Sequence, residues 1–322
     1  MSFRVIGIGE ALWDLLPAGP ELGGAPANFA YHANALGALA QVITRVGNDR
    51  YGHKLLKRFA EMGLPRNLVQ IDKTAPTGTA AVSLAGNGIP RFTIQENVAW
   101  DKLTAPGAAV ACVRKADAVC FGSLAQRTEP SRRSIQRLIA AAPSQSLRVF
   151  DINLRQGFYS REVIGQSLRL ANVLKLNEDE LVVLAKMFGF AKSLHEQIEQ
   201  LTRDFTLRLV ALTRGPKGSL LYQEGRWSEQ QPKPVHVVDT VGAGDAFAAA
   251  LVMALLLRQD LDQAHAAAAE LARYVCSRAG ATPIVPGKFR RFIMRSDRKP
   301  TLKRRKLPKR PSGISSALTE AE

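Results

Sequence analysis

Two glycines directly before a carboxylate and a long apolar helix pattern constrain this chain more than any other feature. They lie in residues 238–247, where Gly242, Ala243 and Gly244 precede Asp245. Glycines permit a tight backbone turn with successive N–H groups pointing the same way, and a helix start adds unpaired N–H groups and the positive end of the helix dipole. This combination predicts an anion site suited to a phosphate group.

Asp245 admits two interpretations. Asp is common at helix starts, where its side chain caps free N–H groups. A carboxylate beside a phosphate site can instead take a proton from a hydroxyl group that attacks phosphorus. The segment alone does not decide between a helix cap and a general base.

Composition places the chain among ordinary folded proteins. It has 322 residues, 46% of them hydrophobic, enough for one large α/β domain or two smaller ones. The longest apolar run, residues 246–257, is shorter than the ~20 residues of a membrane span. Three cysteines without Cys-x-x-Cys spacing and a start that reads as a strand rather than a signal peptide indicate a cytoplasmic protein with no membrane partner.

Charge divides the chain into two parts. The formal net charge is +16, and residues 288–322 carry +9 of it, from twelve Lys or Arg against three acids. We therefore expect a folded domain over residues 1–287 and a basic, disordered tail over 288–322, with a last helical turn or strand as the alternative for residues 289–294. Residues 303–310 raise the alternative of a non-catalytic protein that binds nucleic acid. That run lacks interleaved aromatic residues, so a solvated tail is favoured.

Apolar, β-branched runs alternate with helical patterns through the domain. From about residue 110 the order is mostly strand, helix, strand, helix, which predicts an α/β fold with a doubly wound, mostly parallel sheet flanked by helices. We expect strands at residues 3–9, 40–46, 79–85, 91–95, 117–122, 147–152, 172–176, 208–213, 218–223 and 235–238. We expect helices at residues 26–37, 50–62, 130–142, 160–170, 178–188, 193–203, 244–257 and 260–279.

Two stretches, residues 10–24 and 77–95, break this alternation. Residues 77–95 read as a hairpin because two alternating runs flank an Asn87-Gly88 turn. Strands without helices, inserted into an α/β core, predict a small β-sheet that covers a site as a lid.

Polar residues follow two of the expected strands. Alternation places Asp151, Asn153 and Arg155 on one face at a strand end, where open α/β sheets bind ligands. The alternative is an ordinary polar exit from the strand. Asn177 and Glu180 match a capping box, and they also suit hydrated Mg²⁺ near phosphates; both interpretations can hold together.

Glycine-rich segments mark the remaining candidates. The helix start after Gly24 is either a plain tight turn or a close approach to a ligand, with Asn28 offering a sugar hydroxyl both a donor and an acceptor. Asp14, within an apolar run, either faces solvent on a lid strand or accepts hydrogen bonds from sugar hydroxyls. The segment from Thr213 to Gly218 is either a hairpin loop or a loop along nucleotide phosphates.

Taken in order, these segments resemble the ribokinase-like, or PfkB-type, carbohydrate kinases over residues 3–287. The family motifs are Gly-Gly-x-x-x-Asn, Asp-x-Asn-x-Arg, Asn-x-x-Glu, Thr-x-Gly-x-x-Gly and Asp-Thr-x-Gly-Ala-Gly-Asp. They fall here on residues 23–28, 151–155, 177–180, 213–218 and 239–245. Residues 9–17 are most similar to the fructokinase branch.

The resemblance implies transfer of the ATP γ-phosphoryl group to a hydroxymethyl group of a hexose such as fructose. It implies Asp245 as general base, an anion hole of Gly242, Ala243 and Gly244, and Arg155 as a phosphate contact. Further implied contacts are Asp14, Gly24, Asn28, Asp151 and Asn153 for the sugar, Thr213, Gly215, Lys217 and Gly218 for the nucleotide, and Asn177 and Glu180 for Mg²⁺. Many relatives bind a monovalent cation, which implies K⁺ near Asp239 and the carbonyls of residues 278–281.

The resemblance leaves the acceptor open. Fructokinases often carry an arginine in the segment matching residues 92–97, where this chain has Gln95 and Glu96. A nucleoside or sugar-acid kinase on the same fold is therefore the alternative to a fructokinase. An edge of the lid also offers a surface through which a homodimer can form.

Overall fold

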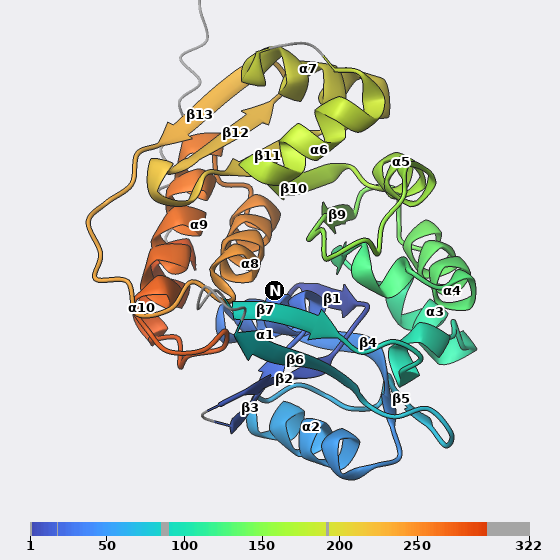
Figure 1. Cartoon of the computed structure of the whole chain (residues 1–322). Coiled ribbons are helices and arrows are strands. Elements are labelled where there is room, and N and C mark those ends of the chain that lie inside the picture. The colour runs from blue at the N-terminus through green and yellow to red at the C-terminus, as the bar shows by residue number, and fades with distance from the viewer. Residues whose placement is uncertain (1, 18, 85–89, 191–192, 295–322) are drawn as a thin grey trace, which may run out of the picture.

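A nine-stranded sheet forms the centre of the molecule in the computed structural model, which describes residues 2–17, 19–84, 90–190 and 193–294. The strand order is β13-β12-β11-β10-β9-β8-β1-β4-β5 (Figure 1). Neighbouring pairs from β11 to β5 are parallel, whereas β12 and β13 join antiparallel. The strands are β1 (Arg4–Ile8), β4 (Leu39–Gly47), β5 (Val69–Asp72), β8 (Ala118–Phe121), β9 (Leu147–Asp151), β10 (Val173–Asn177), β11 (Leu209–Thr213), β12 (Ser219–Gln223) and β13 (Arg226–Gln230).

Helices cover both faces of this sheet (Figure 1). One face packs against α1 (Ala25–Ala35), α2 (Arg50–Glu61), α8 (Ala243–Leu256), α9 (Leu261–Cys276) and α10 (Gly287–Met294). The other packs against α3 (Gly107–Val113), α4 (Glu129–Ala140), α5 (Arg161–Leu170), α6 (Glu178–Phe188) and α7 (Leu194–Phe205). Strand alternation explains the two cores: Val173 belongs to the first hydrophobic cluster and the next residue, Leu174, to the second. The predicted doubly wound architecture is confirmed.

A second sheet has the strand order β3-β2-β6-β7. Its strands are β2 (Leu12–Leu16), β3 (Gly19–Gly23), β6 (Gly78–Leu84) and β7 (Pro90–Ile94), so both stretches that interrupt the α/β alternation contribute to it. The sheet is mixed, because β2 pairs with β6 in parallel and the other pairs are antiparallel. The predicted turn at residues 85–90 falls almost entirely on residues 85–89, outside the described residues.

Three expectations about the elements were wrong or incomplete. Residues 235–238 form no strand; β13 pairs with β12 instead, although its sequence, Arg-Trp-Ser-Glu-Gln, is mostly polar. The sequence patterns also did not identify β5 and α3. Residues 288–294, assigned to the basic tail, lie in α10, where Phe289 and Ile293 are buried against the core.

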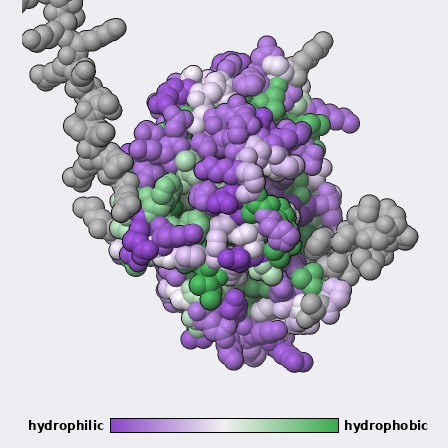
Figure 2. Space-filling model, turned by 90° about the vertical axis from the view of Figure 1, so that its left-hand side faces the viewer, coloured by the Kyte–Doolittle hydropathy of each residue, from purple (hydrophilic) through white to green (hydrophobic). Residues whose placement is uncertain are grey.

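In the part of the chain that the structure describes, none of the helices is both long enough and apolar enough to cross a bilayer. The face shown in Figure 2 is largely hydrophilic, with hydrophobic residues gathered in separate small patches across its middle.

Gly7 lets helix α1 approach strand β1 closely. A Cβ atom at Gly7 would lie 2.0 Å from the backbone oxygen of Pro26, so the helix start and strand cannot both keep their places around a side chain. We expect Gly7→Ala to lower the free energy of unfolding by about 1–3 kcal/mol through overpacking. Chemical denaturation followed by circular dichroism measures this.

The matched control for this substitution is Gly107→Ala. Gly107 begins α3, and its added Cβ would meet no atom within 4 Å. We expect this variant to match the parent or to be more stable by up to about 1 kcal/mol. Equal stability of the two variants would contradict the packing argument.

Candidate active site

A cleft of about 1070 Å³ is lined jointly by the small sheet and by the carboxyl ends of strands in the large sheet. The start of α8 and one side of α9 complete its wall. The predicted site residues that line it are Asp14, Gly24, Asn28, Asn153, Arg155, Asn177, Thr213, Gly215, Gly218, Asp239, Gly242, Ala243, Gly244 and Asp245. Asp151, Glu180 and Lys217 do not line it.

The glycine turn before α8 has the geometry that an anion site needs. Gly242 is the N-cap residue, with φ 76° in the left-handed region and no side-chain cap. A Cβ at Gly242 would lie 2.6 Å from Cα of Ala281, so both the conformation and the packing require glycine. One predicted anion-hole donor is partly engaged, because the Ala243 N–H donates to the carbonyl of Thr240 at 3.3 Å.

Asp245 lies in the first turn of α8, buried at the wall of the cleft. Its Oδ2 accepts a hydrogen bond from Nδ2 of Asn28 at 2.9 Å, which joins two predicted site residues 217 positions apart. Burial, aided by the negative charge of Asp151, raises the pKa of Asp245 to about 6. Such a group can accept a proton near neutral pH, as a general base must.

A buried ion pair lies behind this carboxylate. Lys175 of β10 and Asp151 of β9 are direct neighbours in the parallel register, and Nζ of Lys175 lies 2.9 Å from Oδ1 of Asp151. Asp151 therefore faces Lys175 rather than the cleft. Lys175 itself lines the cleft, and a Cβ at Gly244 would lie 2.7 Å from its Nζ. The sequence motifs did not include Lys175; its one signal was a lysine between two leucines of a buried strand.

Asn177 and Glu180 form the capping box expected at the start of α6. Oδ1 of Asn177 accepts from the Glu180 N–H at 2.9 Å, and Oε2 of Glu180 accepts from the Asn177 N–H at 2.8 Å. Oε1 of Glu180 accepts a third bond, from the Leu154 N–H at 3.0 Å. Both carboxylate oxygens of Glu180 thus accept hydrogen bonds from backbone N–H groups, while Asn177 lines the cleft. Among the described residues, no group of three His, Cys, Asp or Glu side chains is arranged to hold a metal directly.

The small sheet and the start of α1 contribute carboxylates and bare backbone. Asp14 stands opposite Glu21 in the antiparallel pair of β2 and β3; burial, with Glu21 adding to it, raises the pKa of Asp14 to about 6. Glu10, also in the cleft, is 3% exposed, and burial raises its pKa to about 7. Gly24 has φ 110°, and a Cβ there would lie 2.6 Å from the Glu10 carbonyl oxygen, so glycine is needed.

The loop between β11 and β12 brings Thr213, Gly215 and Gly218 to the cleft but not Lys217. Lys217 is exposed, and its Nζ lies 3.0 Å from Oε2 of Glu178, the first residue of α6. Lys217 does not line the cleft in this structure, and its contact with the nucleotide stays a prediction.

Asp239 ties two loops beside the anion site. Its Oδ1 accepts from the Val241 N–H and its Oδ2 from the Gly280 N–H, both at 3.0 Å.

Arg155 is exposed at another part of the cleft, where its guanidinium group donates to the Leu154 carbonyl and, at 3.5 Å, to Oδ1 of Asn153. Arg155 therefore contacts its own loop in this structure.

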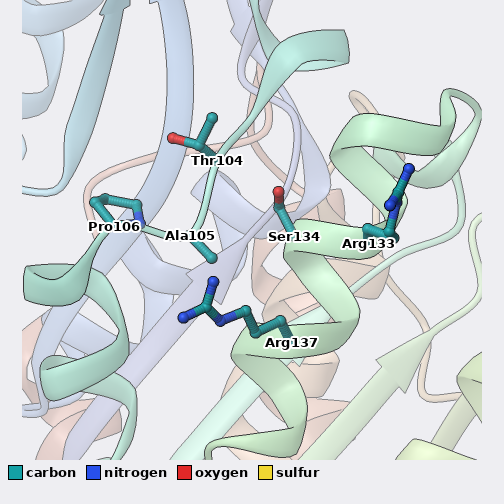
Figure 3. A pocket seen from close by; sticks show the side chains of 6 residues that line it. All are labelled: Thr104, Ala105, Pro106, Arg133, Ser134 and Arg137. Carbon is teal, nitrogen blue, oxygen red and sulfur yellow. The ribbon is translucent and has the colours of Figure 1, made fainter.

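A second hollow, of about 550 Å³, lies between the loop at residues 104–106 and α4 (Figure 3). It shares no lining residue with the main cleft. The Oγ of Ser134 donates to the Pro130 carbonyl, Arg133 pairs with Glu129, and the guanidinium group of Arg137 points toward the loop. Because Ser134 and Arg133 already have these partners, the hollow offers far fewer converging polar groups than the main cleft.

Known proteins resemble this chain in sequence over most of its length. The profile of the pfkB family carbohydrate kinases matches residues 20–287. A fructokinase of Klebsiella pneumoniae is 31% identical over 288 residues, covering 84% of this chain and 91% of that protein.

Two solved structures share the fold and more than a quarter of the aligned residues. A sugar kinase of Pyrococcus horikoshii in complex with ATP has a TM-score of 0.73 and 27% identity, covering 90% of this chain and 99% of that chain. A double mutant of fructokinase from Vibrio cholerae, bound to fructose, ADP and potassium, has a TM-score of 0.76 and 26% identity, covering 90% and 98%.

The burial of Asp245 predicts a stability penalty at neutral pH. Its folded pKa of about 6 exceeds the unfolded value of 3.8, so the folded state binds the extra proton between these values and loses stability as pH rises through 6. We expect Asp245→Asn to raise the free energy of unfolding at pH ~8 by up to about 3 kcal/mol, with no gain at pH ~3. Denaturant unfolding at the two pH values measures this; a less stable variant at the higher pH would contradict it.

Proposed function

Because the chain belongs to the pfkB family of carbohydrate kinases, we propose that it transfers the γ-phosphoryl group of ATP to a hydroxymethyl group of a neutral hexose, with fructose as the leading acceptor. The observation that carries this proposal is the place of Asp245. Its buried carboxylate shares one helix turn with the glycine anion site and faces the same cleft. A proton acceptor and a phosphate site within one turn are what phosphoryl transfer to a hydroxyl group requires.

The reaction assigns each group a step. The acceptor hydroxyl donates to Asp245, which takes the proton as the oxygen attacks the γ-phosphorus atom. The N–H groups of residues 242–244 stabilise the negative charge that develops on the transferred group. Asn28 holds the Asp245 carboxylate through its 2.9 Å hydrogen bond and keeps it oriented toward the acceptor. Arg155, exposed in the cleft, is free to turn toward phosphate when the donor binds.

The nucleotide and its magnesium ion fit the other side of the cleft. Gly215 has φ 54° and Gly218 has φ 87°, and a Cβ at Gly218 would lie 2.0 Å from the Gln230 carbonyl oxygen. This bare backbone, with Thr213, offers close approach to phosphates. Asn177 would accept from water ligands of Mg²⁺, and Glu180 would orient Asn177 through the capping box. When bound, Mg²⁺ neutralises phosphate charge.

A potassium ion fits less completely. Asp239 lines the cleft beside the anion site and retains lone pairs for a cation. The carbonyl oxygen of Ala281, a second expected ligand, lies 2.9 Å from Nε2 of the buried His32. We therefore propose Asp239 as the main protein ligand for K⁺ and expect the Ala281 carbonyl to stay with His32.

Charge at the sugar end supports a neutral acceptor over a sugar acid. Glu10, Asp14 and Glu21 all line the cleft near the small sheet. Carboxylates accept hydrogen bonds from hydroxyl groups, whereas a carboxylate on the acceptor would meet like charge. The exposed Arg155 offsets only part of this negative charge.

Loss of the general base should abolish the chemical step and leave nucleotide binding intact. We expect Asp245→Asn to lower sugar-dependent ADP formation by a factor of about 10²–10⁴. ATP affinity, measured by calorimetry, should change by less than about threefold, since the amide keeps the shape and the Asn28 contact. The control is Asp262→Asn, which removes an exposed partner of Arg226 that does not itself line the cleft. Undiminished turnover in Asp245→Asn would disprove the assignment.

The acceptor proposal predicts an order of substrates. With MgATP, we expect kcat/KM for fructose to exceed that for 2-keto-3-deoxygluconate by at least about tenfold, because like charges placed together cost several kcal/mol. Inosine and adenosine serve as the nucleoside comparison. A higher value for the sugar acid or a nucleoside would replace fructose with that class and leave the kinase assignment standing.

A further inference from the structure

Lys175 is a buried cation that none of the phosphate, sugar or metal motifs accounts for. It is 5% exposed in β10, on the same strand face as Val173, whose side chain packs in the core beside α8. Its Nζ lies 2.9 Å from Oδ1 of Asp151 on the neighbouring strand. The same Nζ packs so closely on Gly244 that any side chain there would collide with it at 2.7 Å. The ammonium group therefore lies directly behind the anion site.

Three buried carboxyl groups act electrostatically on this one ammonium group. Asp151 is 3% exposed, Glu180 4% and Asp245 8%, and the charge of each acts on Lys175. Burying several like charges is costly unless a fixed opposite charge lies among them. The 2.9 Å ion pair with Asp151 supplies the partner that the buried ammonium charge of Lys175 needs.

We infer that Lys175 is a positioning residue for the transfer reaction: its ammonium group, held on Asp151 beneath Gly244, is the counter-charge that keeps the Asp245 carboxylate ionised at neutral pH. This inference rests on the proposed role of Asp245 as general base. It assigns Lys175 an effect through Asp245 and not through contact with the sugar.

The other groups that face Asp245 do not replace Lys175. Glu10, before β2, and Asp151, on β9, are acids and favour the protonated form of Asp245. Cys120, on β8, is buried, and its pKa is raised well above the usual value, so the thiol stays neutral. Arg155 favours the ionised form but is exposed, where water and salt screen its charge. Asn28 contributes a hydrogen bond without charge.

The test replaces Lys175 by methionine, which keeps the length of the side chain and removes the charge. With saturating MgATP and fructose, we expect the acid limb of the kcat profile to move up by at least about one pH unit. At pH ~6 kcat should fall by about fivefold or more, and at pH ~8.5 most of it should return. The control, Lys115→Met, removes an exposed lysine that does not line the cleft and should leave the profile unchanged.

Two results would overturn the inference. One is an unshifted acid limb with kcat reduced by the same factor at every pH, which is the signature of a direct phosphate contact or of a structural role. The other is a profile identical to that of the parent. Lys175→Arg, which keeps the charge, should restore the acid limb if it folds, and Lys175→Gln is the substitute if the methionine variant does not.

A second readout needs no turnover. We expect the ¹³C carboxyl resonance of Asp245, identified by its loss in Asp245→Asn, to titrate near pH 6 in the parent and higher in Lys175→Met. A shifted resonance in a protein without kinase activity would uphold the role of Lys175 and disprove the proposed function. An unshifted resonance in an active kinase would do the reverse.

Discussion

The ion pair between Asp151 and Lys175 sets the electrostatics on which the site depends. It joins neighbouring parallel strands near their carboxyl ends, and it is buried directly behind the glycine turn that begins α8. Removing Lys175 would leave the Asp151 carboxylate unpaired in the core, which is far costlier than losing an exposed pair.

Glycine matters here for space as much as for backbone freedom. Gly242 has positive φ and lies against Ala281, whereas Gly244 is helical and leaves space for the ammonium group of Lys175. This second contact links a residue of the proposed anion hole to a residue of β10 that lies 69 positions earlier in the chain. Close packing of backbone on ammonium keeps that charge near the N–H groups, where its field reinforces the helix dipole.

Local patterns predicted most of the helices and strands. Strand and helix periodicity, the Asn177–Glu180 capping box and glycine turns each depend on residues that lie close together in the sequence. Most of the residues quoted from the family motifs line one cleft. Their catalytic and binding roles stay predictions, as do the lid closure and a homodimer through the lid edge, and the basic run at 303–310 lies outside the described residues. Lys175 and Lys217 show the limit of prediction from local sequence. Lys175 is buried in an ion pair with Asp151, whereas Lys217 is exposed in an ion pair with Glu178. Partners that distant in sequence leave no local signal.

The carboxylates of the cleft are tuned to change charge within a narrow pH range. Burial raises the pKa of Asp14 and Asp245 to about 6 and that of Glu10 to about 7. With the proposed roles, acceptor hydroxyls bind best to ionised carboxylates and the general base must also be ionised, so we expect acidification to weaken sugar binding and proton transfer together. Burial raises the pKa of Asp245 toward the range that a general base needs. In our proposal the charge of Lys175 limits this rise, so that Asp245 is still ionised at neutral pH. The pKa of Asp245 is therefore set by two opposing effects, burial and the charge of Lys175, both of which come from side chains on the central sheet and its adjoining helices.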